Sequence, residues 1–109
     1  MKIKNMDLLI AIKNYTKHLY DSDFKLDVST LYKIRKNMDA VEKAYSPCGK
    51  AVDDVIKMRG DKTDEEIQNE IDILMSEECE VEIEKIPVSA FDGVSATPAF
   101  VNTIFFMLG

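Results

Sequence analysis

Apolar residues recur along most of the chain at spacings of three and four, the pattern of amphipathic helices. We predict a first helix over about residues 6–20, with Asn5 as its N-cap. Its apolar stripe consists of Leu8, Ile12, Tyr15 and Leu19. A second helix begins after Asp27 or Ser29, and its stripe continues through Leu31, Ile34, Met38, Val41, Tyr45, Cys48, Val52 and Val55.

The run Ser46-Pro47-Cys48-Gly49 interrupts this second pattern. Proline inside a helix lacks an N–H group and clashes with the preceding turn, and glycine weakens the helix further. The unbroken register fits one long helix or two collinear pieces, and Ser46 would also serve as the cap of a new helix. We favour a kinked or interrupted helix.

A turn and a third helix follow. Gly60 is expected to end the second helix, and Thr63 and Glu66 have the spacing of a capping box. The third helix then runs to about Ser76, with Ile67, Ile71 and Leu74 facing inward. Because the connection is short, we predict that the second and third helices form an antiparallel hairpin.

Two segments alternate strictly between apolar and charged residues, as strands with one buried face do. In residues 1–4, Lys2 and Lys4 share a face, and in residues 79–86 Glu80, Glu82 and Glu84 share a face while Cys79, Val81 and Ile83 face inward. Pairing these strands places lysine opposite glutamate, which contributes about a few tenths of a kcal/mol for each pair. The direction of the pairing stays open.

The last segment is unusually apolar. Thr97-Pro98 has the pattern of a helix start, so we predict a C-terminal helix over residues 98–108. Its apolar residues occupy more than one face, so the helix is either buried on two sides or in contact with a partner. The fold class is therefore α+β and mostly helical, a single domain over residues 1–109 with a central hairpin, a two-stranded sheet and an apolar C-terminal helix.

Composition supports a small globular protein. The 109 residues are 46% hydrophobic and 31% charged, and no stretch reaches the roughly 20 apolar residues that span a bilayer. The N-terminal residues do not match a secretory signal, and the two cysteines are too few for a disulfide scaffold. We expect a cytoplasmic protein with reduced thiols and no membrane partner.

The charges divide the chain into two parts. Residues 1–60 carry 12 basic and 8 acidic side chains, whereas residues 61–109 carry 2 basic and 12 acidic ones, for a net charge of −6 overall. This balance disfavours direct nucleic-acid binding, which depends on lysine and arginine. The basic positions of the second helix, with acids between them, read as a solvated face: Lys33, Arg35, Lys36, Lys43 and Lys50.

No pattern points to catalysis. His18 is the single histidine, and neither Cys48 nor Cys79 lies in a signature of a nucleophilic cysteine. Zinc, calcium and phosphate-loop motifs are absent from the sequence, so we expect no metal, no cofactor and no enzymatic activity.

The acidic segment is the strongest candidate for a partner-binding face: Glu77, Glu78, Glu80, Glu82 and Glu84. Carboxylates on one face of a strand recur about every 6.6–6.8 Å, which is comparable to the phosphate spacing of one nucleic-acid strand. Such a row could occupy a basic channel in a nuclease or polymerase. The simpler interpretation is a solvated face that is balanced by Lys2 and Lys4 and protects a sheet edge.

The end of the chain also carries a resemblance. Val81-Glu82-Ile83-Glu84-Lys85-Ile86-Pro87, then Ser89-Ala90-Phe91-Asp92-Gly93-Val94, then Thr97-Pro98 resembles the C-terminal signature of small uncharacterised proteins from phages and prophages of Gram-positive bacteria. Those proteins also open with a Met-Lys-Ile-Lys-like strand and carry a charged helical hairpin. The resemblance implies a phage setting in the cytoplasm of a bacterial host, but no activity and no functional residue.

Two main hypotheses follow. In the first, a non-enzymatic accessory protein binds a host or phage protein through the acidic face and inhibits an enzyme that handles nucleic acid, such as a defence nuclease. In the second, a phage assembly protein or chaperone works through its apolar C-terminal helix, as a homodimer or against a partner, using Phe100, Phe105, Phe106 and Leu108. A DNA-binding regulator that uses the basic face of the second helix is a third, weaker hypothesis.

Overall fold

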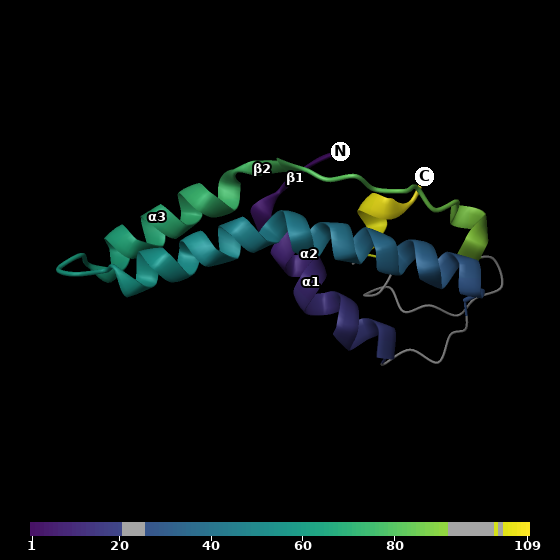
Figure 1. The fold of residues 1–109 in the computed structure, drawn as a ribbon, viewed down its shortest axis with the longest axis horizontal. Helices are drawn as coiled ribbons and strands as arrows, with labels where there is room; N and C mark the ends of the chain where they lie inside the picture. Colours follow the sequence, from purple (N-terminus) through teal and green to yellow (C-terminus); the bar gives the residue numbers. More distant parts are fainter. Residues whose placement is uncertain (21–25, 92–101, 103) are drawn as a thin grey trace.

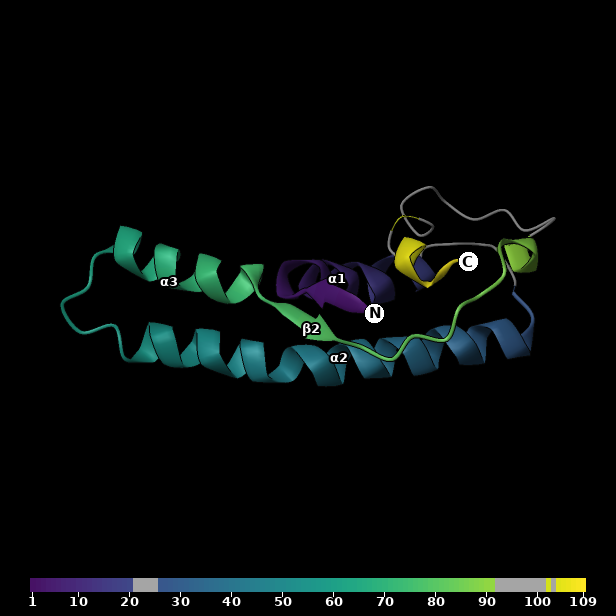
Figure 2. The same cartoon turned by 90° about the horizontal axis from the view of Figure 1, so that it is seen from above.

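The computed structural model describes residues 1–20, 26–91, 102 and 104–109, with the backbone alone for residues 16–20. The chain is elongated, with principal extents of 55 × 26 × 16 Å. The helix α2 (Val28–Lys57) runs along almost the whole length, with α1 (Asn5–Tyr20) beside one half and α3 (Asp64–Ser76) beside the other (Figures 1 and 2). The strands β1 (Lys2–Lys4) and β2 (Glu78–Glu80) lie where α1 and α3 meet.

The helix α1 packs its predicted stripe against α2. Leu8 and Tyr15 are buried and Ile12 packs against the core, while the side chain of Leu19 lies outside the described residues. Asn5 is not the N-cap but the first residue of α1. The cap prediction is wrong because the side chain of Asn5 bonds to Leu74 and Cys79 instead.

The helix α2 is continuous from Val28 to Lys57, so the predicted interruption at Pro47 is wrong. Pro47 and Lys43 are both exposed, so water can bond to the Lys43 carbonyl group that the proline leaves without a donor. Buried residues on both sides of Pro47, including Val41 and Cys48, hold the two halves in the core. Packing of the apolar stripe therefore outweighs the local cost of proline.

Most of the predicted α2 stripe faces inward. Ile34, Met38, Val41 and Cys48 are buried, and Tyr45, Val52 and Val55 are partly buried. Leu31 is the exception, because it is 38% exposed while Thr30 is buried in its place. The helix begins after Asp27, whose carboxylate accepts a hydrogen bond from the Thr30 hydroxyl group.

The predicted hairpin of α2 and α3 is confirmed (Figure 2). Gly60 has φ of 57°, a left-handed conformation that glycine adopts without strain, and it lies in the turn after α2. Thr63 is the N-cap of α3, and its hydroxyl oxygen accepts a hydrogen bond from the Glu66 N–H at 3.2 Å. Ile67 is buried and Ile71 and Leu74 are partly buried, as the pattern predicts.

The two strands pair antiparallel, with Lys2 opposite Glu80, Ile3 opposite Cys79 and Lys4 opposite Glu78. The sequence predicted this pairing of lysine with glutamate and left its direction open. The predicted second strand over residues 79–86 is too long, because β2 spans Glu78–Glu80. The ladder is short because β1 ends at Lys4 and α1 begins at Asn5.

Beyond β2 the chain continues along α2 and meets the C-terminal segment. Ile86 forms a parallel bridge with Leu108, and its N–H donates to the Met107 carbonyl group at 2.8 Å. Two short 3₁₀ helices, η1 (Val88–Phe91) and η2 (Phe105–Met107), complete the described fold.

The predicted C-terminal helix over residues 98–108 is not shown. Residues 98–101 and 103 lie outside the described residues, and the described end of the segment is a 3₁₀ turn followed by extended backbone at Leu108. A helix does not reach Leu108 because its backbone pairs with Ile86. Ile104 and Met107 are fully buried and close the core at this end.

Candidate functional site

The acidic segment of residues 77–84 keeps its alternation beyond β2. Cys79, Val81 and Ile83 are buried or partly buried, whereas every glutamate of the segment is exposed. We define the carboxylate row as the four exposed side chains on one side of this segment: Glu78, Glu80, Glu82 and Glu84. Glu77 is the C-cap residue of α3 and joins the row to that helix.

Two residues of the row have cationic partners. The carboxylate of Glu80 lies 2.8 Å from the N-terminal ammonium group of Met1. The hydrogen bond and charge of that ammonium group lower the pKa of Glu80, and Lys2 adds to the effect. Glu84 lies 3.5 Å from the Lys36 Nζ. Glu77, Glu78 and Glu82 make no ion pair within the part of the chain that the structure describes, and these three carboxylates stay available to a partner.

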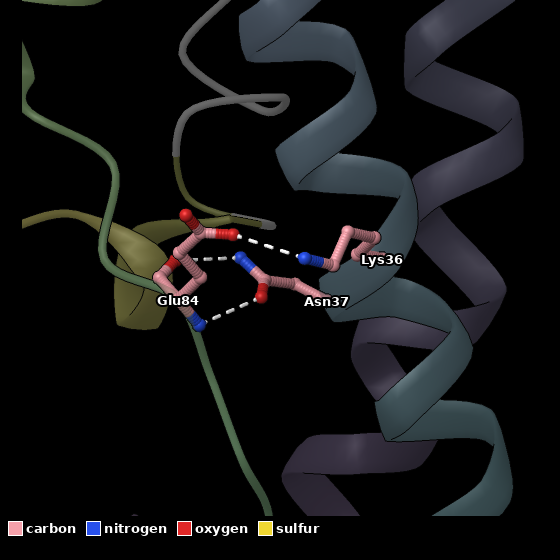
Figure 3. A network of polar contacts seen from close by, with 3 residues as sticks. All are labelled: Lys36, Asn37 and Glu84. Atoms are coloured by element: carbon pink, nitrogen blue, oxygen red, sulfur yellow. Dashed lines mark hydrogen bonds and ion pairs between the residues drawn. The ribbon is translucent and has the colours of Figure 1, made fainter.

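Buried asparagine side chains hold both ends of the segment. At the Glu84 end, the Asn37 side chain donates from Nδ2 to the Glu84 carbonyl group and accepts at Oδ1 from the Glu84 N–H, both at 2.9 Å (Figure 3). Figure 3 also shows Lys36 reaching the Glu84 carboxylate from the neighbouring position of α2. The backbone of the row is thus fixed to α2 while its carboxylates remain outside.

Asn5 has the corresponding role at the other end. Its backbone N–H donates to the Glu77 carbonyl group at 2.9 Å, and its Nδ2 donates to the Leu74 carbonyl group at 2.8 Å. Its Oδ1 accepts from the Cys79 thiol at 2.9 Å. Sequence reasoning missed Asn37, although its spacing of three from Ile34 and four from Val41 places it on the apolar stripe.

The acidic surface extends onto α3, whose first turn also carries the predicted capping box. This helix carries five acids and no base: Asp64, Glu65, Glu66, Glu70 and Asp72. Arg59 pairs with Asp64, and Lys62 pairs with Glu70 at 2.6 Å. The other three acids face no basic partner within 4 Å among the described residues, so the negative surface runs from α3 through Glu77 into the carboxylate row.

The candidate catalytic groups are not brought together in the described part of the chain. The side chain of His18 lies outside the described residues. Cys48 and Cys79 are free thiols, and burial raises the pKa of Cys48. The Cys48 Sγ lies 3.9 Å from the Leu74 carbonyl oxygen. A raised pKa keeps this thiol protonated, which is the behaviour of a structural cysteine.

The residues proposed for an apolar docking helix are dispersed. Phe100 lies outside the described residues. Phe106 and Leu108 are partly buried and pack against the core, whereas Phe105 is 69% exposed. Among the described residues of this set, Phe105 is the one that presents a large apolar surface to solvent.

The described residues contain no group of three or more histidine, cysteine, aspartate or glutamate side chains arranged to hold a metal ion. Within the same residues, no helix combines the length and apolar character of a membrane span. Comparison with protein-family models, curated proteins and solved structures finds no match to this chain.

Proposed function

We propose that this chain is a non-enzymatic accessory protein of the phage type that acts by binding another protein through its acidic surface. The partner is an enzyme that handles nucleic acid, such as a host defence nuclease. In this proposal the carboxylates occupy the basic channel that would otherwise hold phosphates, and they inhibit the enzyme by occlusion.

The observation that carries this proposal is the exposed carboxylate row on a fixed backbone. Side chains on one face of an extended chain recur about every 6.6–6.8 Å, so the row presents negative charges at regular intervals. The anchors at Asn5 and Asn37 hold the segment before binding, which lowers the conformational entropy lost on association. The negative charge of α3 adds a long-range attraction to a basic partner.

The test neutralises the carboxylates of the segment that make no ion pair with another described residue. We would compare the wild-type protein with the triple variant Glu77→Gln, Glu78→Gln, Glu82→Gln in affinity capture from bacterial lysate, and then measure the dissociation constant for the enzyme recovered. Exposed charge pairs contribute about 0.2–1 kcal/mol each, so three losses amount to about 0.6–3 kcal/mol and should weaken binding by about 3- to 160-fold. Addition of duplex DNA should release the wild-type protein, because DNA competes for the same channel.

The matched control carries the same change of net charge elsewhere. The exposed acids Glu42, Asp53 and Asp54 lie on α2, and their replacement by the corresponding amides should leave binding within about twofold of wild type. Raising the salt concentration from 0.1 to 1 M shortens the Debye length from about 10 Å to about 3 Å and should weaken the complex strongly. Equal binding by the two triple variants, or binding that DNA does not compete, would exclude occlusion through this surface.

Phe105 supports a second candidate function, a phage assembly protein or chaperone that works through the C-terminal segment. The buried residues Ile104 and Met107 are close to it in sequence, but the Phe105 side chain itself is exposed. Its replacement should therefore not disturb the core. Under this alternative, Phe105→Ser would abolish self-association or recovery of phage structural proteins, and the carboxylate variants would bind normally.

A further inference from the structure

An open groove lies beside β1, and Glu78 of β2 contributes to its lining. It has a volume of about 520 Å³ and is bounded by β1, by the first half of α1 and by η2. Its apolar wall includes two large exposed side chains, Ile10 at 49% and Phe105 at 69%. We call this the β1 groove, and its main lining residues are Lys2, Lys4, Ile10, Ala11, Phe105 and Phe106.

Among the described residues, part of the β1 backbone makes no hydrogen bond to β2. The Val81 N–H donates to the Met1 carbonyl group at 2.8 Å, and the Asn5 N–H donates to the Glu77 carbonyl group at 2.9 Å. In an antiparallel ladder the bonded residues alternate, so this register directs the N–H and C=O groups of Lys2 and the N–H of Lys4 away from β2. These groups form an edge that a further strand can extend.

The charges on this edge indicate what the added strand would carry. Lys2 and Lys4 make no ion pair within 4 Å among the described residues, although they lie opposite Glu80 and Glu78 in the sheet. A strand on the free side of β1 places its own residues opposite the same two lysines. Directly opposed unlike charges stabilise a strand pair and like charges destabilise it, so carboxylates are preferred there. The groove also contains Asp7 and Glu78, and Glu78 already lies opposite Lys4 in the sheet.

A second copy of this chain does not meet these requirements. Pairing of β1 with its own copy would place Lys2 and Lys4 against lysines, which is destabilising. Pairing of β1 with β2 of a copy would need the outer edge of β2, but β2 lies between β1 and α2 and contacts α2 (Figure 2). A segment of a different protein that carries carboxylates opposite the two lysines does meet them.

We propose that β1 accepts an extended segment of a partner protein as a third strand, with carboxylates opposite Lys2 and Lys4 and apolar side chains between them in the β1 groove. This inference goes beyond the proposed function, because its contacts are lysines, backbone groups and apolar side chains rather than the carboxylate row. Addition of a strand to an exposed sheet edge is an established mode of peptide recognition, in which backbone bonds give affinity and alternate side chains give specificity.

The experiment uses a fluorescent peptide that alternates glutamate with valine, and a matched peptide with lysine in place of glutamate. Fluorescence anisotropy should show saturable binding of the glutamate peptide and at least about tenfold weaker binding of the lysine peptide. Methylation of backbone nitrogens at one alternating set of peptide positions should abolish binding, and methylation at the other set should not. If binding depended on charge alone, methylation of either set of backbone nitrogens would leave the affinity of the peptide unchanged.

Protein variants locate the site. Ile10→Ser should weaken peptide binding at least about tenfold, whereas the control Ile56→Ser, at a residue of 52% exposure on α2, should not change it. The proposal is overturned if the glutamate peptide does not bind, if the two serine variants bind equally well, or if sedimentation shows a dimer that Ile10→Ser dissociates. The double variant Glu77→Gln, Glu82→Gln leaves the groove residue Glu78 unchanged and should retain peptide binding, so this proposal and the proposed function can fail separately.

Discussion

Replacement of Asn37 by alanine should release the acidic segment from α2 and destabilise the protein. Asn37 is 2% exposed and makes two hydrogen bonds of 2.9 Å with the backbone of Glu84. A neutral hydrogen bond contributes about 0.5–1.5 kcal/mol, and a buried group left without its partner costs about 1–3 kcal/mol. We therefore expect a loss of about 2–4 kcal/mol from a free energy of unfolding that is typically about 5–15 kcal/mol.

Urea unfolding followed by circular dichroism measures this loss, and amide hydrogen exchange at Glu84 reports the release of the segment directly. The control is Lys36→Ala, which removes the exposed ion pair with the same residue and a contact with the ring of Tyr32 at 5.4 Å from its centroid. Both lost contacts are solvent-exposed, so this variant should cost no more than about 1 kcal/mol. The reasoning is refuted if Asn37→Ala unfolds within about 0.5 kcal/mol of wild type, or no more easily than Lys36→Ala.

Two other predictions concern α2 and the N-terminus. Pro47→Ala should stabilise the protein by about 1–3 kcal/mol in thermal or urea unfolding, because alanine restores a helical N–H group at an exposed position; unchanged or lower stability would show that the proline is not a local cost. Acetylation of the Met1 amino group should raise the pKa of Glu80 towards its ordinary value of 4.5, as followed by carboxyl NMR. The pKa of Asp27, which the Thr30 hydroxyl group lowers, should not change. Because the pKa of Glu80 is lowered in the folded state, this residue stabilises the fold above pH 4.5 and loses that effect as the pH falls through its folded-state pKa. Acetylation should therefore remove this dependence of stability on pH.

Local patterns in the sequence were sufficient for the hairpin and for the strand pairing. Gly60 and Thr63 act within a few residues of themselves, so their roles could be predicted without knowledge of the rest of the fold. The opposition of Lys2 and Lys4 to glutamates was predictable because both strands alternate with a period of two and carry opposite charges. These are properties of one or two segments alone.

The errors arose where distant segments compete for the same polar groups. Asn5 matched the composition of an N-cap, but α3 and β2 supply partners for its side chain that are about 70 residues away in sequence. Residues 81–86 had the alternation of a strand, but after Val81 the backbone finds other partners: Asn37 bonds to Glu84, and the C-terminal segment pairs with Ile86. Pro47 predicted a break because propensity does not include the buried stripe on both sides of it.

The arrangement of contacts around residues 77–84 separates folding from the charge of the surface. The inward anchors are neutral: the amides of Asn5 and Asn37 and the buried side chain of Val81. The outward groups of Glu77, Glu78 and Glu82 make no ion pair among the described residues, so their neutralisation changes the surface potential and costs only about a few tenths of a kcal/mol where Glu78 lies opposite Lys4. Loss of partner binding in the triple glutamine variant, with unfolding unchanged, would therefore be an effect on recognition. Loss of binding in Asn37→Ala would instead reflect both a less stable fold and a released segment. Comparison of these two variants tests whether the partner needs the carboxylates alone or the carboxylates on a fixed backbone.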